Sequence, residues 1–316
     1  MTSATTGHLW RLGTRGSDLA RTQSRQVADA LTAAGAGELD LVVVRTEGDV
    51  STAPLSSLGG TGVFAGALRA ALLDGEVDVV VHSLKDLPTA PHPGLTIAAV
   101  PPREDPRDAL CARDGHTLAT LPPGARVGTG SPRRAALLLI TRPDLTIVDI
   151  RGNVPTRLAR TENDLDAVVL ALSGLRRLGL EDRATDILGP PTFLPAPGQG
   201  ALAVETRDDV DSELPGLAAA LRAVHHAPSA AAVVAERTLL GRLEAGCAAP
   251  VGALATLDGD RLALDALVSR PDGALHLRRS GGRSLDPADT ELAAGLGRDL
   301  ADELLIAGAG DLMDTA

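Results

Sequence analysis

The sequence predicts a mixed α/β protein, with two α/β domains followed by a small α+β domain. Three observations support this prediction. The first hundred residues alternate between strand-like and helix-like hydrophobic periods. A second block of the same kind is enclosed by two proline-rich crossings, VPPREDPRDAL and GPPTFLPAPGQGAL. Beyond HHAPS the pattern changes to a long helix and strand-like runs joined by LDGD and PDG turns.

The first block opens with a predicted strand at residues 9–14. Ser17 can cap the helix that follows, and residues 41–44 predict a second strand. Residues 46–62, TEGDVSTAPLSSLGGTG, are rich in glycine and small polar residues. Their length and composition predict a loop or lid.

A predicted helix at residues 64–73 leads to a nearly continuous apolar strand at residues 77–81. Such a strand is typical of a parallel sheet that is buried on both faces. The segment HSLKD, residues 82–86, follows at the carboxyl end of this strand. Ligands of open α/β sheets bind at this edge, so we expect functional residues here.

The second block contains three predicted strands, at residues 126–128, 146–150 and 167–172. The chain then returns to a strand near residues 201–205. We therefore expect this block to be inserted into the first domain, with two hinge strands and a cleft between the domains.

The third domain is predicted to hold a helix, three short strands and a last helix with one apolar stripe. Its helix is expected at residues 229–243 and its strands at residues 251–256, 261–268 and 274–279. The resulting division is domain 1 at residues 8–102 and 200–223, domain 2 at 103–199 and domain 3 at 224–316.

The formal net charge of −11 argues against binding to nucleic acid or to anionic membranes. The sequence has no secretory signal and no apolar run near the ~20 residues of a membrane span. We therefore expect a cytoplasmic protein. Two cysteines and seven histidines without ligand spacing predict neither a disulfide framework nor a metal site.

Arginines gather at predicted helix starts. In VGTGSPRR, Ser131 suits the cap of a helix whose first turn carries Arg133 and Arg134. In DIRGNVPTRLAR, Arg151 follows a strand and Arg157 lies in the next helix's first turn. Cations there oppose the helix dipole, which favours an anion site over structural optimisation. The alternative is an ordinary capped helix with solvated arginines. A third strand-to-helix turn, TRGS, adds Arg15 and Ser17.

The only lysine in the chain is Lys85, in VVVHSLKDLP, and Asp86 follows it. A carboxylate at this strand end could accept a hydrogen bond from a ligand N–H and stabilise a developing cation. The alternative is a surface ion pair in a turn. A compact ammonium could be required here, although drift from lysine to arginine would also leave one lysine.

The two cysteines lie in different settings. Cys111, in DALCAR, is expected to be buried in a strand as a small hydrophobic residue. Cys247 lies in EAGCAAP, a loop of small residues between a helix and a strand, where a thiol would be accessible.

Taken together, these residues resemble the porphobilinogen deaminase, or hydroxymethylbilane synthase, family. The matching segments follow the family's order along the whole chain: TRGSDLARTQ, EGDV, HSLKDLP, REDPRDA, GTGSPRR, RPDL, RGNVPTRL, LALSGLRRLGL, LPAPGQGA and AERTLLGRLEAGCAAPVG. The resemblance implies a two-lobed pair of α/β domains like a periplasmic binding protein, with mixed sheets. A small C-terminal domain with a three-stranded antiparallel sheet completes the implied fold.

The resemblance also implies a dipyrromethane cofactor, joined by a thioether to Cys247. The implied cofactor-binding residues are Lys85, Gly130, Ser131, Arg133, Arg134 and Arg151. The implied substrate-binding residues are Arg15, Ser17, Thr61, Phe64, Arg151, Arg157 and Gln199. Asp86 matches the family's catalytic residue.

The implied activity is that of a transferase in tetrapyrrole, or porphyrin, biosynthesis. Porphobilinogen loses ammonia to give an azafulvene, whose positive charge Asp86 would stabilise through the pyrrole N–H. Four substrate molecules are added head to tail to the cofactor, and water releases hydroxymethylbilane. The arginines would neutralise the carboxylates that accumulate along the growing chain.

The chain departs from the family pattern at two positions. Thr61, in GGTGVF, stands where the family usually has a lysine, which removes a charge that could touch substrate. Gly130 stands where serine is common, which removes a hydroxyl from the cofactor site. Phe64 matches the family's loop aromatic.

Two other functions remain open at this point. One is a cytoplasmic two-lobed module that binds or senses an anion without catalysis, which leaves Cys247 and the third domain without a role. The other is a deaminase impaired by Thr61 and Gly130. No interface patch is evident in the sequence, so we expect a monomer.

Overall fold

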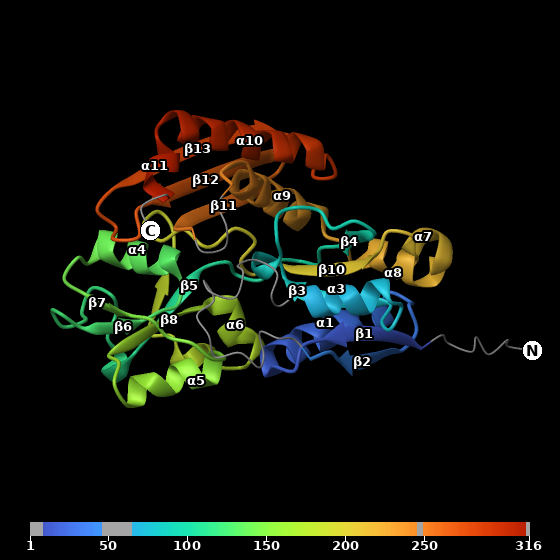
Figure 1. Cartoon of the computed structure of the whole chain (residues 1–316), viewed down its shortest axis with the longest axis horizontal. Coiled ribbons are helices and arrows are strands. Elements are labelled where there is room, and N and C mark those ends of the chain that lie inside the picture. The colour runs from blue at the N-terminus through green and yellow to red at the C-terminus, as the bar shows by residue number, and fades with distance from the viewer. Residues whose placement is uncertain (1–8, 46–64, 245–248, 314–316) are drawn as a thin grey trace, which may run out of the picture. The chain divides into compact units, whose positions relative to one another are not determined.

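The computed structural model describes residues 9–45, 65–244 and 249–313. The chain forms two compact units (Figure 1). Unit 1 consists of Met1–Pro102 and Leu202–His226, and unit 2 of Arg103–Ala201 and Ala227–Ala316. The predicted lid at residues 46–62 lies outside the described residues.

Unit 1 is built on a five-stranded sheet with the order β2-β1-β3-β10-β4. Its strands are β1 (Trp10–Thr14), β2 (Leu39–Val43), β3 (Val79–Ser83), β4 (Leu95–Ala99) and β10 (Leu202–Arg207). Its helices are α1 (Asp18–Ala33), α3 (Gly66–Leu73), the 3₁₀ turn η2 (Leu84–Asp86), α7 (Val210–Glu213) and α8 (Pro215–Val224). Strand β1 is parallel to β2 and β3, whereas the returning strand β10 is antiparallel to β3 and β4.

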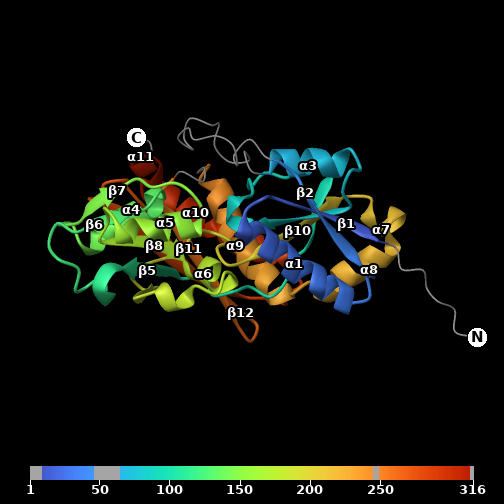
Figure 2. The ribbon, with the colours of Figure 1, turned by 90° about the horizontal axis from the view of Figure 1, so that it is seen from below.

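Both faces of this sheet are covered, as the apolar strand predicts. Figure 2 shows α1 and α3 on opposite sides of the sheet. Val79 and Val81 pack into the core that contains α1 and α8, whereas Val80 packs into the core that contains α3. Successive side chains of β3 therefore pack into two different cores. The polar segment that follows the strand, residues 84–86, lies at the edge of the sheet.

Unit 2 contains a second five-stranded sheet, in the order β7-β6-β8-β5-β9. Its strands are β5 (Asp108–Ala112), β6 (Arg126–Gly128), β7 (Thr146–Val148), β8 (Ala167–Ala171) and β9 (Asp186–Leu188). Its helices are α4 (Pro132–Thr141), α5 (Val154–Ala159) and α6 (Leu172–Arg177), with 3₁₀ turns η3 (Arg113–Gly115), η4 (Arg160–Glu162) and η5 (Glu181–Arg183). Strands β7, β6 and β8 are parallel and β5 is antiparallel to its neighbours, so both large sheets have the same pattern.

The C-terminal part of unit 2 is a three-stranded antiparallel sheet covered by helices. Its elements are α9 (Ala227–Arg242), β11 (Val251–Asp258), β12 (Arg261–Ser269), β13 (His276–Ser284), α10 (Thr290–Ile306) and α11 (Ala309–Met313). Helices α9 and α10 lie along this sheet in Figure 1, and both contribute to its core. Leu267 of β12 instead packs into a core with Phe193 and Leu194, so the three-stranded sheet and the α/β part share apolar contacts.

The predicted fold class is confirmed: two mixed α/β sheets and a three-stranded antiparallel sheet. Some element boundaries are wrong. The predicted strand 146–150 ends at Val148, because the chain turns there toward Arg151. The last strand runs from His276 to Ser284 rather than over residues 274–279, because its pairing with β12 continues through two glycines. The short strands β4 and β9, which lie at sheet edges, were not predicted.

Candidate functional site

The first group of candidate residues lies on η2, the turn directly after β3. Leu84 and Leu87 are buried in the core and hold the turn at both ends. Between them Lys85 is partly exposed and Asp86 is exposed. The spacing of the leucines in LKDL therefore directs both charged side chains away from the core. In this position they can contact a ligand.

Helix α1 holds the ends of two neighbouring strands. The Ser24 hydroxyl donates to Thr14 Oγ1 over 2.8 Å, next to Arg15. The amide of Gln23 donates to the Ser83 hydroxyl over 3.0 Å, next to the η2 turn. Because β1 and β3 are parallel neighbours, Arg15 and Asp86 both lie just beyond the carboxyl ends of their strands, at the same edge of the sheet.

Ser17 has the structural role that the sequence predicts. It caps α1 with extended backbone angles, and its hydroxyl accepts a hydrogen bond from the Ala20 amide over 3.3 Å. Arg15 and Ser17 are both partly exposed.

A buried ion cluster that was not predicted from the sequence joins α3, β3 and β10. Glu205 of β10 accepts two hydrogen bonds from Arg69 on one oxygen, over 2.8 and 3.1 Å, and lies 3.2 Å from His82 Nε2. Burial alone raises the pKa of the Glu205 carboxyl, but its hydrogen bonds to His82 and Arg69 hold the pKa below its usual value. The signal in the sequence was a glutamate inside the apolar run LAVE.

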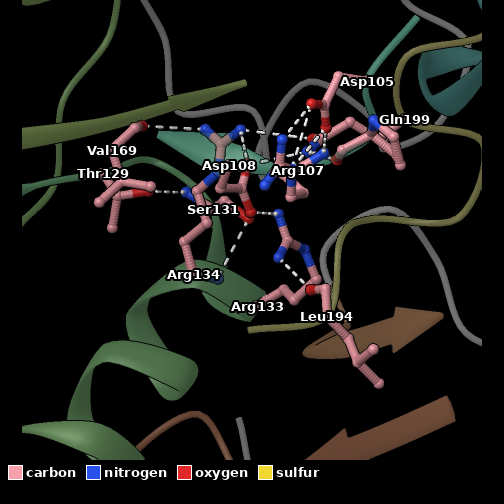
Figure 3. Close-up of polar contacts among 11 residues, drawn as sticks. Asp105, Arg107, Asp108, Thr129, Ser131, Arg133, Arg134, Val169, Leu194 and Gln199 are labelled. Atoms are coloured by element: carbon pink, nitrogen blue, oxygen red, sulfur yellow. Dashed lines mark hydrogen bonds and ion pairs between the residues drawn. The ribbon is translucent and has the colours of Figure 1, made fainter. Parts of the chain in front are cut away.

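The second group of candidates lies in unit 2, at the start of α4 (Figure 3). Ser131 caps this helix, because its hydroxyl accepts a hydrogen bond from the Arg134 amide over 3.4 Å. Its own amide donates to Thr129 Oγ1 over 3.2 Å. Ser131 is partly exposed and Gly130 beside it is exposed.

Arg133 and Arg134 point into the protein, although the sequence placed them at a helix start next to a ligand. They are 3% and 6% exposed. Both bind the carboxylate of Asp108: Arg133 Nη2 reaches Oδ2 over 2.7 Å, and Arg134 Nη2 reaches Oδ1 over 2.7 Å (Figure 3). Their other Nη groups donate to the carbonyl oxygens of Leu194 and Val169.

The charges of this cluster do not balance. Among the residues that the structure describes, two buried guanidiniums bind one buried carboxylate, which leaves one positive charge in excess. Arg133 Nε is also buried without a hydrogen-bond partner among the described residues. Burial alone raises the pKa of Asp108, but the charges of Arg133 and Arg134 lower it to about 2. A buried excess of positive charge favours an anion, such as a carboxylate, at the start of α4.

Gln199 belongs to the same cluster. It has no exposed surface, and its amide donates to Asp108 Oδ1 over 2.9 Å and to the Pro106 carbonyl over 2.7 Å. Its backbone carbonyl accepts a hydrogen bond from Arg103 Nε over 2.8 Å. Asp108 and Arg103 were not predicted as site residues. A charged residue inside the apolar strand sequence DALCA was the available signal for Asp108.

Arg151 and Arg157 flank the start of α5, and both are partly exposed. Asn153 caps this helix by accepting a hydrogen bond from the Thr156 amide over 2.9 Å. Arg157 Nε donates to the Gly152 carbonyl over 2.7 Å, so its side chain folds back over the turn that carries Arg151.

Three candidates, Thr61, Phe64 and Cys247, lie outside the described residues. The other cysteine, Cys111, is buried as predicted, and burial raises the pKa of its thiol to about 11. Over residues 9–45, 65–244 and 249–313 no cluster of three or more His, Cys, Asp or Glu side chains could hold a metal ion. In the same ranges no helix has the length and apolar character that crossing a membrane requires.

Two mixed five-stranded sheets of one strand order and a three-stranded antiparallel sheet place the chain in the class of mixed α/β proteins. Residues 10–214 match the family model "Porphobilinogen deaminase, dipyromethane cofactor binding domain", and residues 230–306 match "Porphobilinogen deaminase, C-terminal domain". The chain therefore belongs to the porphobilinogen deaminase family, and the predicted resemblance is confirmed.

Curated relatives agree with the family models. The porphobilinogen deaminase of Leifsonia xyli subsp. xyli is 56% identical over 307 residues, which cover 96% of this chain and 93% of the relative. That of Thermobifida fusca is 53% identical over 310 residues, which cover 97% and 96%. A solved structure, the methionine binding protein MetQ, matches with a TM-score of 0.45 and 12% identity over 68% of this chain and 89% of that one. A likeness this loose adds nothing to the assignment.

Proposed function

We propose that the chain is a transferase that deaminates porphobilinogen and joins four molecules head to tail on a covalent dipyrromethane primer. The products are hydroxymethylbilane and ammonia. The family membership of residues 10–214 and 230–306 supports the reaction. The observation in the structure that carries the proposal is the buried excess positive charge at Asp108, Arg133 and Arg134. A purely structural cluster would gain by balancing its charges.

The residues around α4 would hold the carboxylates of the primer. When bound, the dipyrromethane supplies the pyrrole carbon to which substrate is joined, and Cys247 is its proposed thioether attachment. The partly exposed Ser131 hydroxyl would bind a carboxylate at the helix start, and the buried guanidiniums of Arg133 and Arg134 would supply positive charge to it. The full proposed set of primer-binding residues is Lys85, Gly130, Ser131, Arg133, Arg134 and Arg151.

A second set of residues is proposed to bind the substrate. It comprises Arg15, Ser17, Thr61, Phe64, Arg151, Arg157 and Gln199. Gln199 would act indirectly, because its side chain is buried against Asp108 and supports Arg134.

Asp86 is the proposed catalytic residue. Its exposed carboxylate, on a turn held by two buried leucines, would accept a hydrogen bond from the pyrrole N–H of the substrate. As ammonia leaves, positive charge develops on the pyrrole, and a fixed carboxylate stabilises that charge. Lys85 would keep a compact positive charge beside it for a substrate or primer carboxylate.

We further propose a division into three domains, at residues 8–102 with 200–223, at 103–199 and at 224–316. Each of the three sheets is lined by an apolar core, which supports this division, and Leu267 of β12 joins domain 3 to the core of domain 2. A monomer in the cytoplasm is the proposed state of the protein.

The stoichiometry of the reaction tests the proposed function. Purified protein is incubated with porphobilinogen, and ammonia and linear tetrapyrrole are measured in the same samples. The proposal predicts four ammonia molecules for each tetrapyrrole released. A module that only binds anions, the alternative function, would bind porphobilinogen and release no ammonia.

A further inference from the structure

The turns that carry Ser131 and Arg151 lie side by side in unit 2. Strands β6 and β7 are parallel neighbours, with Gly128 opposite Val148. The pairing continues past the strand ends, because the Thr129 amide donates to the Val148 carbonyl over 3.0 Å. Gly130 and Ile150 follow these two positions and meet each other across the turns.

Gly130 is in contact with the backbone of the neighbouring turn. A Cβ atom at this position would lie 2.6 Å from the Ile150 carbonyl oxygen and 3.3 Å from Asp149 Oδ1. Its φ angle is outside the left-handed region, so glycine is required here for space and not for backbone conformation. The carbonyl oxygen of Ile150 belongs to the peptide group that contains the Arg151 nitrogen.

The backbone that follows Arg151 in the chain is also closely packed. Gly152 has a φ angle of +104°, and a Cβ atom there would lie 2.9 Å from Thr156 Cγ2 on α5. Ile150 is 2% exposed, and its side chain lies in the apolar core of this sheet. The peptide of Arg151 is therefore confined, and a side chain at Gly130 would have to displace it.

Gly128 provides a natural comparison. A Cβ atom at Gly128 would meet side chains only, at 2.5 Å from Leu165 Cδ1 and 3.0 Å from Ile150 Cδ1. The two glycines of GTG thus both lie against Ile150. Gly128 lies against the Ile150 side chain, and Gly130 lies against the Ile150 carbonyl oxygen. A substitution at Gly128 disturbs core packing, whereas one at Gly130 moves the backbone that carries Arg151.

We propose that Gly130 is a positioning residue for Arg151. Its missing side chain lets the Ile150–Arg151 peptide approach the start of α4, so that Arg151 and Ser131 act on the same carboxylate-bearing ligand. This inference rests on the proposed function, in which Arg151 binds primer and substrate carboxylates. It assigns Gly130 a role through the backbone, where a serine would have contributed a hydroxyl.

A double-mutant cycle tests the role through Arg151. Values of kcat/KM for porphobilinogen are measured for the unmutated holoenzyme, for Gly130→Ala, for Arg151→Lys and for the double variant. We expect Gly130→Ala to lower kcat/KM on the order of tenfold, as for a weakened charged hydrogen bond. In the Arg151→Lys background the same change should have much less effect, because the positioned group is already altered.

Two controls and a second readout separate positioning from stability. Gly128→Ala should lower the melting temperature while its kcat/KM stays within about twofold of the unmutated value. Ile150→Val shortens the side chain but keeps the backbone carbonyl, so we expect the same two results from it. Intact mass should show that Gly130→Ala apoprotein acquires the two-pyrrole addition more slowly than Gly128→Ala apoprotein when both are given porphobilinogen.

The outcomes are distinguishable. If Gly130→Ala and Arg151→Lys have additive effects, or if Gly130→Ala changes only the melting temperature, the inference is wrong. If Gly130→Ala does not fold, the Ile150→Val variant still tests the inference. A large loss of kcat/KM with Ile150→Val would show that the Ile150 side chain positions Arg151, which would contradict the inference. If the unmutated enzyme does not turn over porphobilinogen, the proposed function itself fails.

Discussion

Arg103 and Glu236 form a buried bidentate ion pair, with 2.7 Å from Nη1 to Oε1 and 3.0 Å from Nη2 to Oε2. Glu236, on α9, is completely buried and also accepts hydrogen bonds from the backbone amides of Gly198 and Ala255. One carboxylate thus joins the returning crossing, helix α9 and strand β11. Through the Gln199 carbonyl, Arg103 connects this pair to the cluster of Asp108.

Replacing Glu236 with glutamine should destabilise the protein strongly. The variant keeps the shape of the side chain but leaves Arg103 buried without its counter-charge, which typically costs about 3–5 kcal/mol. The free energy of unfolding is measured by urea titration. The exposed pair Arg242–Asp302 is the matched control, and Arg242→Ala should cost at most about 1 kcal/mol. Similar losses for the two variants would show that burial of the first pair has little energetic importance.

Asp108 should make the protein's stability depend on acid pH. Its pKa is lowered from 3.8 to about 2 in the folded protein. A lowered folded-state pKa stabilises the fold above the unfolded pKa, and this contribution is lost as pH falls from about 4 to 2. The expected loss is about 2 kcal/mol. Urea titrations between pH 5 and pH 2.5 should show this part of the slope in the unmutated protein but not in Asp108→Asn.

The exposed aspartate of the Arg283–Asp299 pair is the control for this pH effect. Asp299→Asn should retain the acid slope. If Asp108→Asn retained it as well, other carboxylates would be responsible for the slope.

Replacing Asp86 with asparagine should abolish most turnover while the fold is unchanged. Asparagine removes the charge that stabilises the developing pyrrole cation, and positioned carboxylates of this kind contribute on the order of 10²- to 10⁴-fold. Steady-state release of ammonia measures the effect. Asp74→Asn, an exposed aspartate at the end of α3, should keep full activity. Activity of Asp86→Asn within a few-fold of the unmutated enzyme would exclude Asp86 as the catalytic residue.

Lys85→Arg tests whether a compact ammonium is required. The charge is kept, but the planar guanidinium is wider than an ammonium and binds in a different geometry. We expect kcat/KM to fall on the order of tenfold, which is equivalent to one weakened charged interaction. Unchanged kinetics would instead favour compositional drift as the reason for the single lysine.

The sequence was sufficient to predict the fold class and the local structure of the site turns. Caps at Ser17 and Ser131 depend on residues three positions away, and the apolar run before HSLKD identifies a strand buried on both faces. These features are local, so a single sequence contains the whole signal. The motif order along the chain was enough to recognise the family, which the family models confirm.

The orientation of Arg133 and Arg134 could not be predicted in the same way. A pattern-based reading places arginines at a helix start toward solvent or ligand, but both side chains turn inward to Asp108, which lies 25 and 26 residues away. Which residue faces which across a fold depends on tertiary packing. The contact of Gly130 with the Ile150 carbonyl is likewise invisible in the sequence, because it depends on backbone positions in two turns.

The most direct test of the proposed function is the intact mass of the denatured protein, compared with the mass calculated from its sequence. We expect an excess of two linked pyrrole units, which is absent when Cys247 is replaced with serine. An unmodified mass that persists after incubation with porphobilinogen or preformed tetrapyrrole would contradict the proposed function, and would favour a protein that binds anions without catalysis.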